Sequence, residues 1–136
     1  MKLLDTDICV GLFRGESTVV SRWRDCNERC AISAMSIGEL SYGAAKARDP
    51  QAERVRIDRL MHILDEGPAT KPVMMRFGEI KADLESQGLR LADADVLIAA
   101  TAIEFDMTLV TGNTKHFSRI DGLRLENWFD THPTLC

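Results

Sequence analysis

The sequence predicts an α/β sandwich built around a short, mostly parallel sheet. Very short apolar segments alternate with longer stretches of helical periodicity, the pattern that places helices over a parallel sheet. Acidic or amide side chains stand where several of these apolar segments end. No repeat, low-complexity tract or linker interrupts the 136 residues, so we expect a single domain over residues 1–136.

The expected elements follow from apolar spacing and from breakers. Strands are predicted at residues 2–4, 31–33, 108–110 and 123–125, and helices at 8–13, 19–29, 51–64, 72–87 and 93–105. A further helix is expected after Ser36 as its cap, carrying Ile37, Leu40 and Ala44. Gly15, Gly67-Pro68 and Gly88 end helices. In such a sheet, sites form at the carboxyl ends of the strands.

Composition describes a soluble chain with its own core. Hydrophobic residues make up 45% and charged residues 28%, with a net charge of −4. No apolar run reaches the roughly 18 residues of a membrane span, and Asp5 and Asp7 interrupt the N-terminal apolar stretch where a signal peptide would need it. We therefore expect a cytoplasmic protein with no membrane partner. The acidic balance disfavours a generic nucleic-acid binder, although a nuclease with a carboxylate site can be acidic.

The cysteines give little sign of a structural role. Of the four, only Cys26 and Cys30 are close in sequence, and the predicted helix places both on one face. The histidines, including His132, form no ligand-spaced pair with them, which disfavours zinc. Reduced thiols, Cys136 among them, are the interpretation that fits a cytosolic protein.

Acids gather at the ends of otherwise apolar elements. Asp5 follows the first strand, Glu39 lies early in the third helix, Asp93 and Asp95 open an apolar helix, and Asn113 follows the strand at 108–110. Such acids are costly to desolvate unless they are paired or bind a cation. Mg²⁺ or Mn²⁺ prefers oxygen ligands, acidifies a water and stabilises charge on a phosphate. The pattern favours a metal-dependent phosphodiesterase.

Each acid also has a structural interpretation. Asp5 or Asp7 can cap the helix that begins near Ile8, and Glu39 lies three residues after Ser36, the spacing of a capping box. Asp93 can cap its own helix, and it diverges from Asp95 by about 200° around the helix axis. Asn113 can be a turn residue. No Ser or Cys has a nearby His in sequence, so a covalent nucleophile is not indicated.

Five ordered motifs make a resemblance specific. They are Leu-Leu-Asp5-Thr-Asp7-Ile, Ser36-Ile-Gly-Glu39-Leu-Ser-Tyr-Gly, Asp95-Val-Leu-Ile-Ala-Ala-Thr-Ala, Leu-Val-Thr-Gly-Asn113-Thr-Lys-His-Phe117 and Gly122-Leu-Arg-Leu-Glu-Asn-Trp128. With them the chain resembles, over essentially its whole length, VapC-type proteins of the PIN-domain family, the toxin half of bacterial toxin–antitoxin pairs. The chain departs from that pattern with Asp7 where Asn is common and with His116 where an acid often precedes the Phe.

The resemblance implies a PIN-like three-layer α/β/α sandwich and a Mg²⁺- or Mn²⁺-dependent endoribonuclease. It implies that Asp5, Glu39 and Asp95 are the metal ligands, with Asn113 in the fourth position and Asp93 in second rank. It also implies a homodimer, restrained by a cognate VapB-like antitoxin, that cuts tRNA or another structured RNA with an activated water. One metal ion or two is left open.

Two other hypotheses stand beside the toxin. One is a PIN nuclease with a non-toxin role in RNA processing or DNA cleavage, and the other is a DNA-binding regulator whose acidic cluster has no function. Lys115 and His116 are candidates for substrate contact, and Trp23 and Tyr42 for base stacking, although single aromatics at apolar helix positions are more often core residues. An antitoxin is expected in an apolar groove between the early helices, formed by Phe13, Val19, Trp23 and Leu40.

Overall fold

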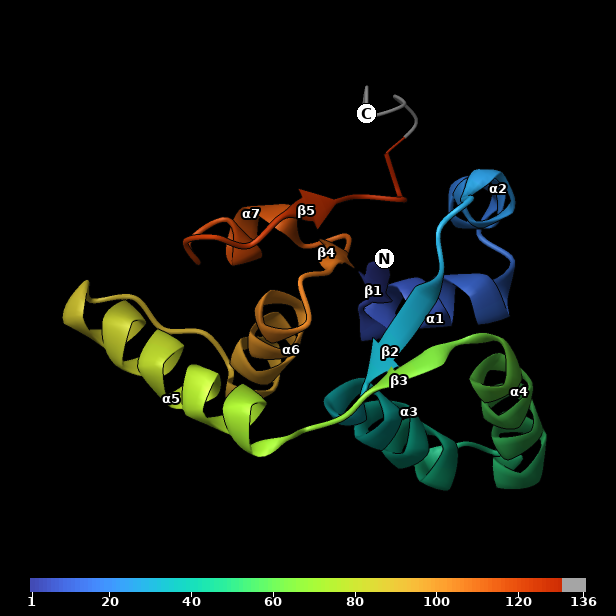
Figure 1. The fold of residues 1–136 in the computed structure, drawn as a ribbon. Helices are drawn as coiled ribbons and strands as arrows, with labels where there is room; N and C mark the ends of the chain where they lie inside the picture. The colour runs from blue at the N-terminus through green and yellow to red at the C-terminus, as the bar shows by residue number, and fades with distance from the viewer. Residues whose placement is uncertain (131–136) are drawn as a thin grey trace.

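The computed structural model describes residues 1–130 and shows a parallel sheet between two layers of helices (Figure 1). His132 and Cys136 lie outside the described residues. The sheet order is β3-β2-β1-β4-β5, and every neighbouring pair is parallel. The elements in chain order are β1 Lys2–Leu4, α1 Thr6–Arg14, α2 Ser17–Asp25, β2 Cys30–Ser33, α3 Ala34–Lys46, α4 Pro50–Ile63, β3 Asp65–Gly67, α5 Lys71–Ser86, α6 Asp93–Glu104, β4 Thr108–Val110, α7 Thr114–Phe117 and β5 Leu125–Glu126. The predicted fold class is confirmed.

Two cores fill the space on the two faces of the sheet. Successive residues of a strand point to opposite faces, so Leu3 packs in the core under α5 and α6 while Leu4 packs with residues of α1, α3 and α4. Both side chains have no exposed surface. Figure 1 shows α5 and α6 on one side of the sheet and α1, α2 and α4 on the other. A strand of three residues therefore contributes a buried side chain to the core on each face of the sheet.

Helix boundaries follow from local capping. Asp5, Ser33, Asp49 and Thr70 each accept a hydrogen bond from a backbone N–H of the first turn of the helix that follows. Gly15, after α1, has φ +68° and Gly88, after α5, has φ +73°, a left-handed conformation that glycine adopts without steric cost. The breakers identified in the sequence at these two positions are thus helix ends.

Several predicted boundaries are wrong. The helix expected over 19–29 ends at Asp25, and α3 is capped by Ser33 rather than Ser36. Residues 65–67 form β3, where the sequence predicted only a breaker at Gly67-Pro68, and the last strand is Leu125–Glu126 rather than 123–125. The short helix α7 was not predicted. Each miss concerns an element of four or fewer residues or a helix end, where periodicity carries little information.

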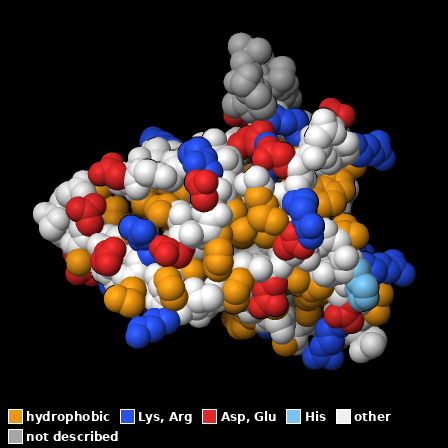
Figure 2. Space-filling view, viewed as in Figure 1, with side chains coloured by type: hydrophobic (Ala, Val, Ile, Leu, Met, Phe, Trp, Pro, Cys, Tyr) orange, Lys and Arg blue, Asp and Glu red, His pale blue; other side chains and the backbone are white. Residues whose placement is uncertain are grey.

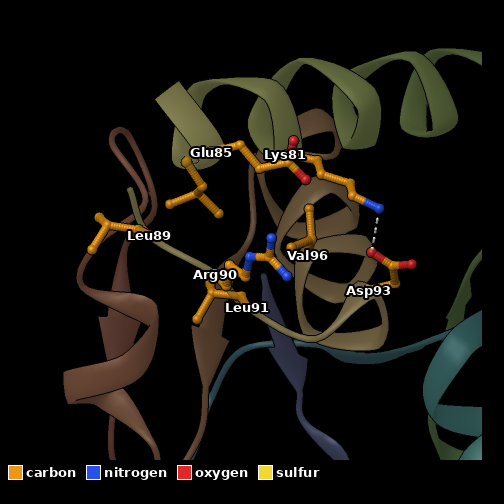
Figure 3. A pocket seen from close by; sticks show the side chains of 8 residues that line it. Lys81, Glu85, Leu89, Arg90, Leu91, Asp93 and Val96 are labelled. Carbon is orange, nitrogen blue, oxygen red and sulfur yellow. Dashed lines mark ion pairs between the residues drawn. The ribbon is translucent and has the colours of Figure 1, made fainter. Parts of the chain in front are cut away.

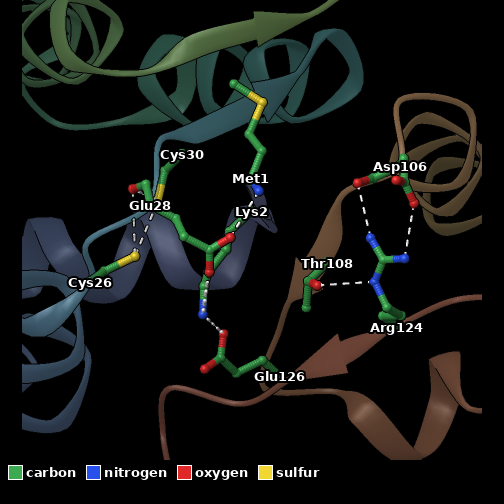
Figure 4. Close-up of polar contacts among 9 residues, drawn as sticks. All are labelled: Met1, Lys2, Cys26, Glu28, Cys30, Asp106, Thr108, Arg124 and Glu126. Atoms are coloured by element: carbon green, nitrogen blue, oxygen red, sulfur yellow. Dashed lines mark hydrogen bonds and ion pairs between the residues drawn. The ribbon is translucent and has the colours of Figure 1, made fainter. Parts of the chain in front are cut away.

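Paired charges join the strands β1 and β5 to α2, and we call this group the Glu126 cluster: Lys2, Arg22, Glu28 and Glu126. Figure 4 shows Lys2, Glu28 and Glu126. The Lys2 ammonium contacts Glu126, and Arg22 Nη2 lies 2.9 Å from Glu126 Oε1. Lys2 also lies 3.5 Å from Glu28, which pairs with the N-terminal ammonium at 2.9 Å. The cluster joins β1, α2 and β5.

Cys26 and Cys30 do not share a helix face, contrary to the sequence-based expectation. Cys26 is the C-cap of α2 and Cys30 begins β2, and a short turn brings their sulfur atoms within 3.9 Å (Figure 4). Both thiols are free, as is that of Cys9. The turn replaces the last residues of the predicted helix, which explains how the two residues stay close.

The surface carries charge of both signs. On the face shown in Figure 2, acidic and basic side chains are interspersed, with apolar side chains between them. The large exposed apolar side chains include Tyr42, Met74 and Met75. In the part of the chain that the structure describes, no helix is long and apolar enough to cross a membrane.

Candidate active site

Acidic side chains from three elements of the chain meet around one cavity of about 480 Å³, which we call the carboxylate pocket. The elements are the β1–α1 junction, α3 and the first turn of α6, and the loop after β4 closes the cavity. β1 and β4 are neighbours in the sheet, so both loops leave its carboxyl edge. The lining residues are Asp5, Thr6, Asp7, Val10, Gly11, Arg14, Glu16, Glu39, Asp95, Asn113 and Phe129. The four site residues expected from the sequence, Asp5, Glu39, Asp95 and Asn113, all line it.

Asp5 is fixed by two hydrogen bonds and is only 7% exposed. Its Oδ1 accepts from the Thr6 backbone N–H at 2.8 Å, and its Oδ2 accepts from the Thr111 hydroxyl at 2.8 Å. Burial raises the pKa of Asp5 to about 6, and the charges of Asp7 and Asp95 add to the rise, which the two hydrogen bonds oppose. Asp5 therefore caps α1 and lines the pocket with the same carboxylate.

Asp7 joins the pocket instead of capping α1. Its Oδ2 accepts from the Gly112 backbone N–H at 2.8 Å, across the pocket from the loop after β4. Its Oδ1 is buried and has no hydrogen-bond partner in the described chain. Burial raises the pKa of Asp7, and the charge of Asp95 contributes to the rise. A buried carboxylate oxygen without a partner is costly, and a cation offers it one.

Glu39 is half-buried and takes no part in a capping box. The Ser36 backbone N–H is bonded by Ser33 Oγ at 3.0 Å, so the cap of α3 is complete without Glu39. Instead, the Thr6 hydroxyl lies 2.8 Å from Glu39 Oε1 and 2.9 Å from Ser36 Oγ. The side chain of Glu39 is thus oriented by the residue that follows Asp5.

The charge of Asp95 is influenced by the acid Glu39 and by the base His116. Burial raises its pKa, the charge of His116 opposes that rise, and the charge of Glu39 adds to it. His116 Nε2 lies 3.6 Å from Asp95 Oδ2, an ion pair when the imidazole is protonated. The structure therefore places His116 beside Asp95, although His116 does not itself line the pocket.

Asn113 is more than a turn residue. Its backbone N–H donates to the Thr111 hydroxyl at 3.1 Å, which links it to the oxygen that holds Asp5. Asn113 precedes α7, yet its side chain makes no capping hydrogen bond to that helix. The amide is therefore left for the pocket, which it lines.

Asp93 does not line the carboxylate pocket. It pairs with Lys81 of α5 at 3.0 Å, and it lines a separate cavity of about 320 Å³ between α5 and the start of α6 (Figure 3). Side chains two positions apart on a helix point about 200° away from each other, which explains why Asp93 and Asp95 face different cavities. The structure therefore places Asp93, the second-rank candidate for a metal ligand, outside the carboxylate pocket.

The donor chemistry of the pocket fits a hard divalent cation. The donors are carboxylate and amide oxygens, three of the carboxyl groups have raised pKa values, and Asp7 has a buried oxygen without a partner. As the side chains stand in residues 1–130, no three His, Cys, Asp or Glu groups converge closely enough to hold a metal ion. The ligand types are therefore in place, and binding requires the side chains to draw together.

Sequence reasoning assigned no role in this site to Thr6, Thr111 or Phe129. Thr6 and Thr111 orient Glu39 and Asp5, while Phe129 lines the cavity. The two threonines stand inside the quoted motifs, so their proximity to the acids was a usable signal. Phe129 carries no such signal, because it reaches the pocket through the bend after β5.

Relatives of known type match this chain along most of its length. A family model described as PIN domain matches residues 2–123. Ribonuclease VapC2 of Rickettsia felis is 33% identical over 129 residues, which cover 93% of this chain and 96% of the relative. The tRNA(fMet)-specific endonuclease VapC of Shigella flexneri is 31% identical over 127 residues with the same coverage.

Solved structures agree with the sequence relatives. The VapBC2 complex of Rickettsia felis, bound to a DNA fragment from the promoter, contains a chain that matches with a TM-score of 0.87 and 32% identity, covering 93% of this chain and 98% of that one. A DNA-bound VapBC of Salmonella typhimurium matches with a TM-score of 0.88 and 28% identity, covering 94% and 98%. The family predicted from the motifs is confirmed, and this chain belongs to the PIN domain family.

Proposed function

We propose that this chain is an endoribonuclease that hydrolyses RNA phosphodiester bonds in the carboxylate pocket, and that it is the toxin of a type II toxin–antitoxin pair. The observation that carries the proposal is the meeting of Asp5, Glu39, Asp95 and Asn113 around one cavity. The names of the relatives, a ribonuclease and a tRNA-specific endonuclease, support the substrate class. The reaction takes place in the cytoplasm on tRNA or another structured RNA.

Asp5, Glu39 and Asp95 would hold Mg²⁺ or Mn²⁺, and the partnerless oxygen of Asp7 adds a fourth donor to the same pocket. When bound, such a cation lowers the pKa of water and offsets the charge of the phosphate. It would also offset the burial and, to a smaller extent, the mutual repulsion that raise the pKa values of Asp5, Asp7 and Asp95.

The chain's own residues position the reactants. Thr111 and Thr6 form hydrogen bonds with the carboxylates of Asp5 and Glu39 and so orient them. Asn113 supplies a neutral amide that orients a neighbouring carboxylate or a water molecule. His116 Nε2 lies 3.6 Å from Asp95 Oδ2 and offsets its charge when the imidazole is protonated. Water attack on phosphorus then breaks the bond to the 3′ oxygen and leaves a 5′-phosphate and a 3′-hydroxyl.

The partner protein of this proposal is a small VapB-like antitoxin. The groove predicted for it is present in part: a cavity of about 330 Å³ between α1, α3 and α4 is lined by Phe13 and Leu40, among others. Val19 is fully buried, and Trp23 packs edge-on against Trp128 at 6.3 Å between ring centroids, so these two belong to the core. This cavity and the carboxylate pocket share Arg14 and Glu39, so one peptide can reach both.

We also propose that the chain acts as a homodimer. Three large apolar side chains on α3 and α5, Tyr42, Met74 and Met75, are 66%, 43% and 59% exposed. Large apolar side chains that stay exposed favour contact with a second copy. Size-exclusion chromatography with light scattering tests this, and a monomer at micromolar concentration contradicts it.

The proposed function is tested by incubating the purified protein with total RNA, with and without Mg²⁺ or Mn²⁺, and by mapping the ends of the fragments. We expect 5′-phosphate ends and loss of cleavage by about 100-fold or more in D95N, because the ligand set is broken. D93N is the matched control, since it removes the same charge two residues away but outside the pocket. Full cleavage by folded D95N contradicts the assignment.

The toxin role needs a separate test. We expect expression of the chain alone to slow growth, and co-expression of the adjacent small reading frame to restore it. If expression alone is harmless while the purified protein cuts RNA, the chain is a processing nuclease of the same fold. Cleavage of DNA in preference to RNA favours the other non-toxin role.

A further inference from the structure

One aromatic side chain lies at the wall of the carboxylate pocket. Phe129 lines the cavity and is 36% exposed, whereas the preceding Trp128 is almost fully buried and anchors the segment. The Phe129 backbone N–H donates to Asn127 Oδ1 at 2.8 Å, which fixes the bend between them. The ring is therefore held in place from the backbone side while part of it faces the pocket.

Two glycines make room for this ring. A Cβ at position 112 would lie 2.7 Å from Phe129 Cδ2 and 2.9 Å from Asp7 Oδ2, and a Cβ at position 11 would lie 3.4 Å from Phe129 Cζ. The ring thus packs directly on the backbone of Gly112, whose N–H bonds the carboxylate of Asp7. The ring therefore lies against the residue that precedes Asn113, and that residue is hydrogen-bonded to one of the acids of the pocket.

The other aromatic candidates do not reach the pocket. Trp23 packs against Trp128, and Tyr42 is 66% exposed on α3 with the Lys46 ammonium 4.8 Å above its ring. Neither lines the cavity. Among the lining residues Phe129 is the only aromatic one, and Arg14 is the only one with a positive charge. An apolar π-face beside carboxylates and one cation is suited to a ligand that has both a base and a phosphate.

We propose that Phe129 is a stacking platform for the nucleobase next to the scissile phosphate of an RNA strand. The inference rests on the proposed function for its ligand. An aromatic face stacks on any base and contributes about 1–3 kcal/mol per base by substitution, without hydrogen-bond readout. Phe129 then orients the strand over the carboxylates and takes no part in bond breaking.

The direct test uses binding, with cleavage prevented by D95N. The probe is a single-stranded RNA dodecamer that carries one 2-aminopurine, whose fluorescence is quenched when the base stacks. We expect quenching on addition of the D95N protein, and affinity reduced at least about fivefold in D95N/F129L, which keeps apolar bulk but removes the π-face. D95N/F129Y should retain both. Affinity in D95N/F129L equal to that of D95N overturns the proposal.

Controls separate stacking from a structural role and from failure of the proposed function. F105A removes a Phe of nearly equal exposure, 37%, at the end of α6 and away from the pocket, and it should leave binding unchanged. In the cleaving protein F129L should raise KM with little change in kcat, because stacking acts on bound RNA before and during the reaction. Absence of quenching in the D95N protein, which retains Phe129, also overturns the proposal.

The remaining outcomes are distinguishable. If wild-type protein cuts no RNA but D95N/F129L still binds the dodecamer more weakly than D95N does, the proposed function fails and the base subsite stands. If wild-type protein cuts RNA and F129L cuts with unchanged KM, the function stands and the subsite fails. If F129L weakens binding of the antitoxin and leaves RNA binding unchanged, Phe129 belongs to the protein interface and the proposal is overturned.

Discussion

Two groups of buried carboxylates in this molecule differ in how their charge is balanced. In the Glu126 cluster, the Glu126 side chain is 9% exposed and contacts both the Lys2 ammonium and Arg22. In the carboxylate pocket, no Lys or Arg of residues 1–130 pairs with Asp5, Asp7, Glu39 or Asp95, and His116 is the only base that pairs with one of them. The charge of Glu126 is balanced by its neighbours, whereas the charge of the pocket is not.

The pKa values record this difference. Burial lowers the pKa of Lys2, but the hydrogen bond and the charge of Glu126 outweigh burial and raise it. In the pocket, burial and like charges act together and raise the pKa values of Asp5, Asp7 and Asp95. Charge left unbalanced within a cavity is typical of a functional site, whereas balanced charge contributes to the fold.

The largest expected effect on stability comes from the balanced group. E126Q should lower the free energy of unfolding by about 2–3 kcal/mol, because two cations lose their counterion. The effect stays below that of a fully buried pair since Lys2 and Arg22 are 12% and 19% exposed. Urea denaturation followed by circular dichroism measures it. A change below about 0.5 kcal/mol would show that the cluster contributes nothing.

The corresponding change in the pocket should have the opposite sign. D5N removes a charge that is buried among like charges, and Asn can still accept the Thr6 N–H bond that caps α1. A carboxyl with a pKa of about 6 rather than 3.8 costs the folded state up to about 3 kcal/mol at neutral pH. We expect the free energy of unfolding of D5N to exceed that of wild type by about 1–2 kcal/mol. Urea denaturation in EDTA at pH 7.5 measures the difference.

The gain in the free energy of unfolding that D5N gives should become smaller as the pH falls. Because the folded pKa of Asp5 lies above the unfolded value, the folded protein takes up a proton first and wild type gains stability as pH falls from about 6 to 4. The difference between D5N and wild type should therefore shrink across that window. A difference that stays constant from pH 7.5 to pH 4 would remove Asp5 ionisation as its cause.

Divalent metal should stabilise only through the pocket. At about ten times its dissociation constant, Mn²⁺ should add about 1.4 kcal/mol to the wild-type protein, because it binds the folded state alone. E126Q should show the same increment and D5N a smaller one. Thermal unfolding with and without Mn²⁺ measures both. Equal increments in D5N and wild type would place the metal outside the pocket.

The smallest expected effect is at Asp93. Its ion pair with Lys81 joins side chains that are 65% and 44% exposed, so solvent screens it. D93N should change the free energy of unfolding by less than about 0.5 kcal/mol and should leave the Mn²⁺ increment unchanged. A lost increment in D93N would mean that Asp93 turns into the pocket when metal binds.

The sequence was sufficient for the layers and for the principal acids. Leu3 and Leu4 form the apolar part of β1, and Asp5 directly follows that strand. The same short segment therefore predicts both the strand and an acid at its carboxyl end. β3 was missed because Asp65-Glu66-Gly67 has no apolar pattern. It becomes a strand only by pairing with β2, a tertiary interaction that local propensity does not contain.

The hydrogen-bond partners of these side chains were harder to predict from the sequence than the positions of the residues. Ser33 and Ser36 are both possible caps of α3, and the choice of Ser33 depends on where β2 ends. That choice releases Glu39 from the capping box and leaves it for Thr6, which comes from another element. Phe129 reaches the pocket only because Gly11 and Gly112 lie beneath it, a contact between segments that are distant in sequence.

Asp5 holds the start of α1 and faces the pocket with the same carboxylate. Asn is the replacement that retains the cap and removes the charge, and the codons of Asp and Asn differ by one base. With the role proposed for Asp5, a single point mutation should give a form that is inert and at least as stable as the parent. Under selection against its activity, we expect silencing to proceed through a persistent folded protein rather than through loss of the fold.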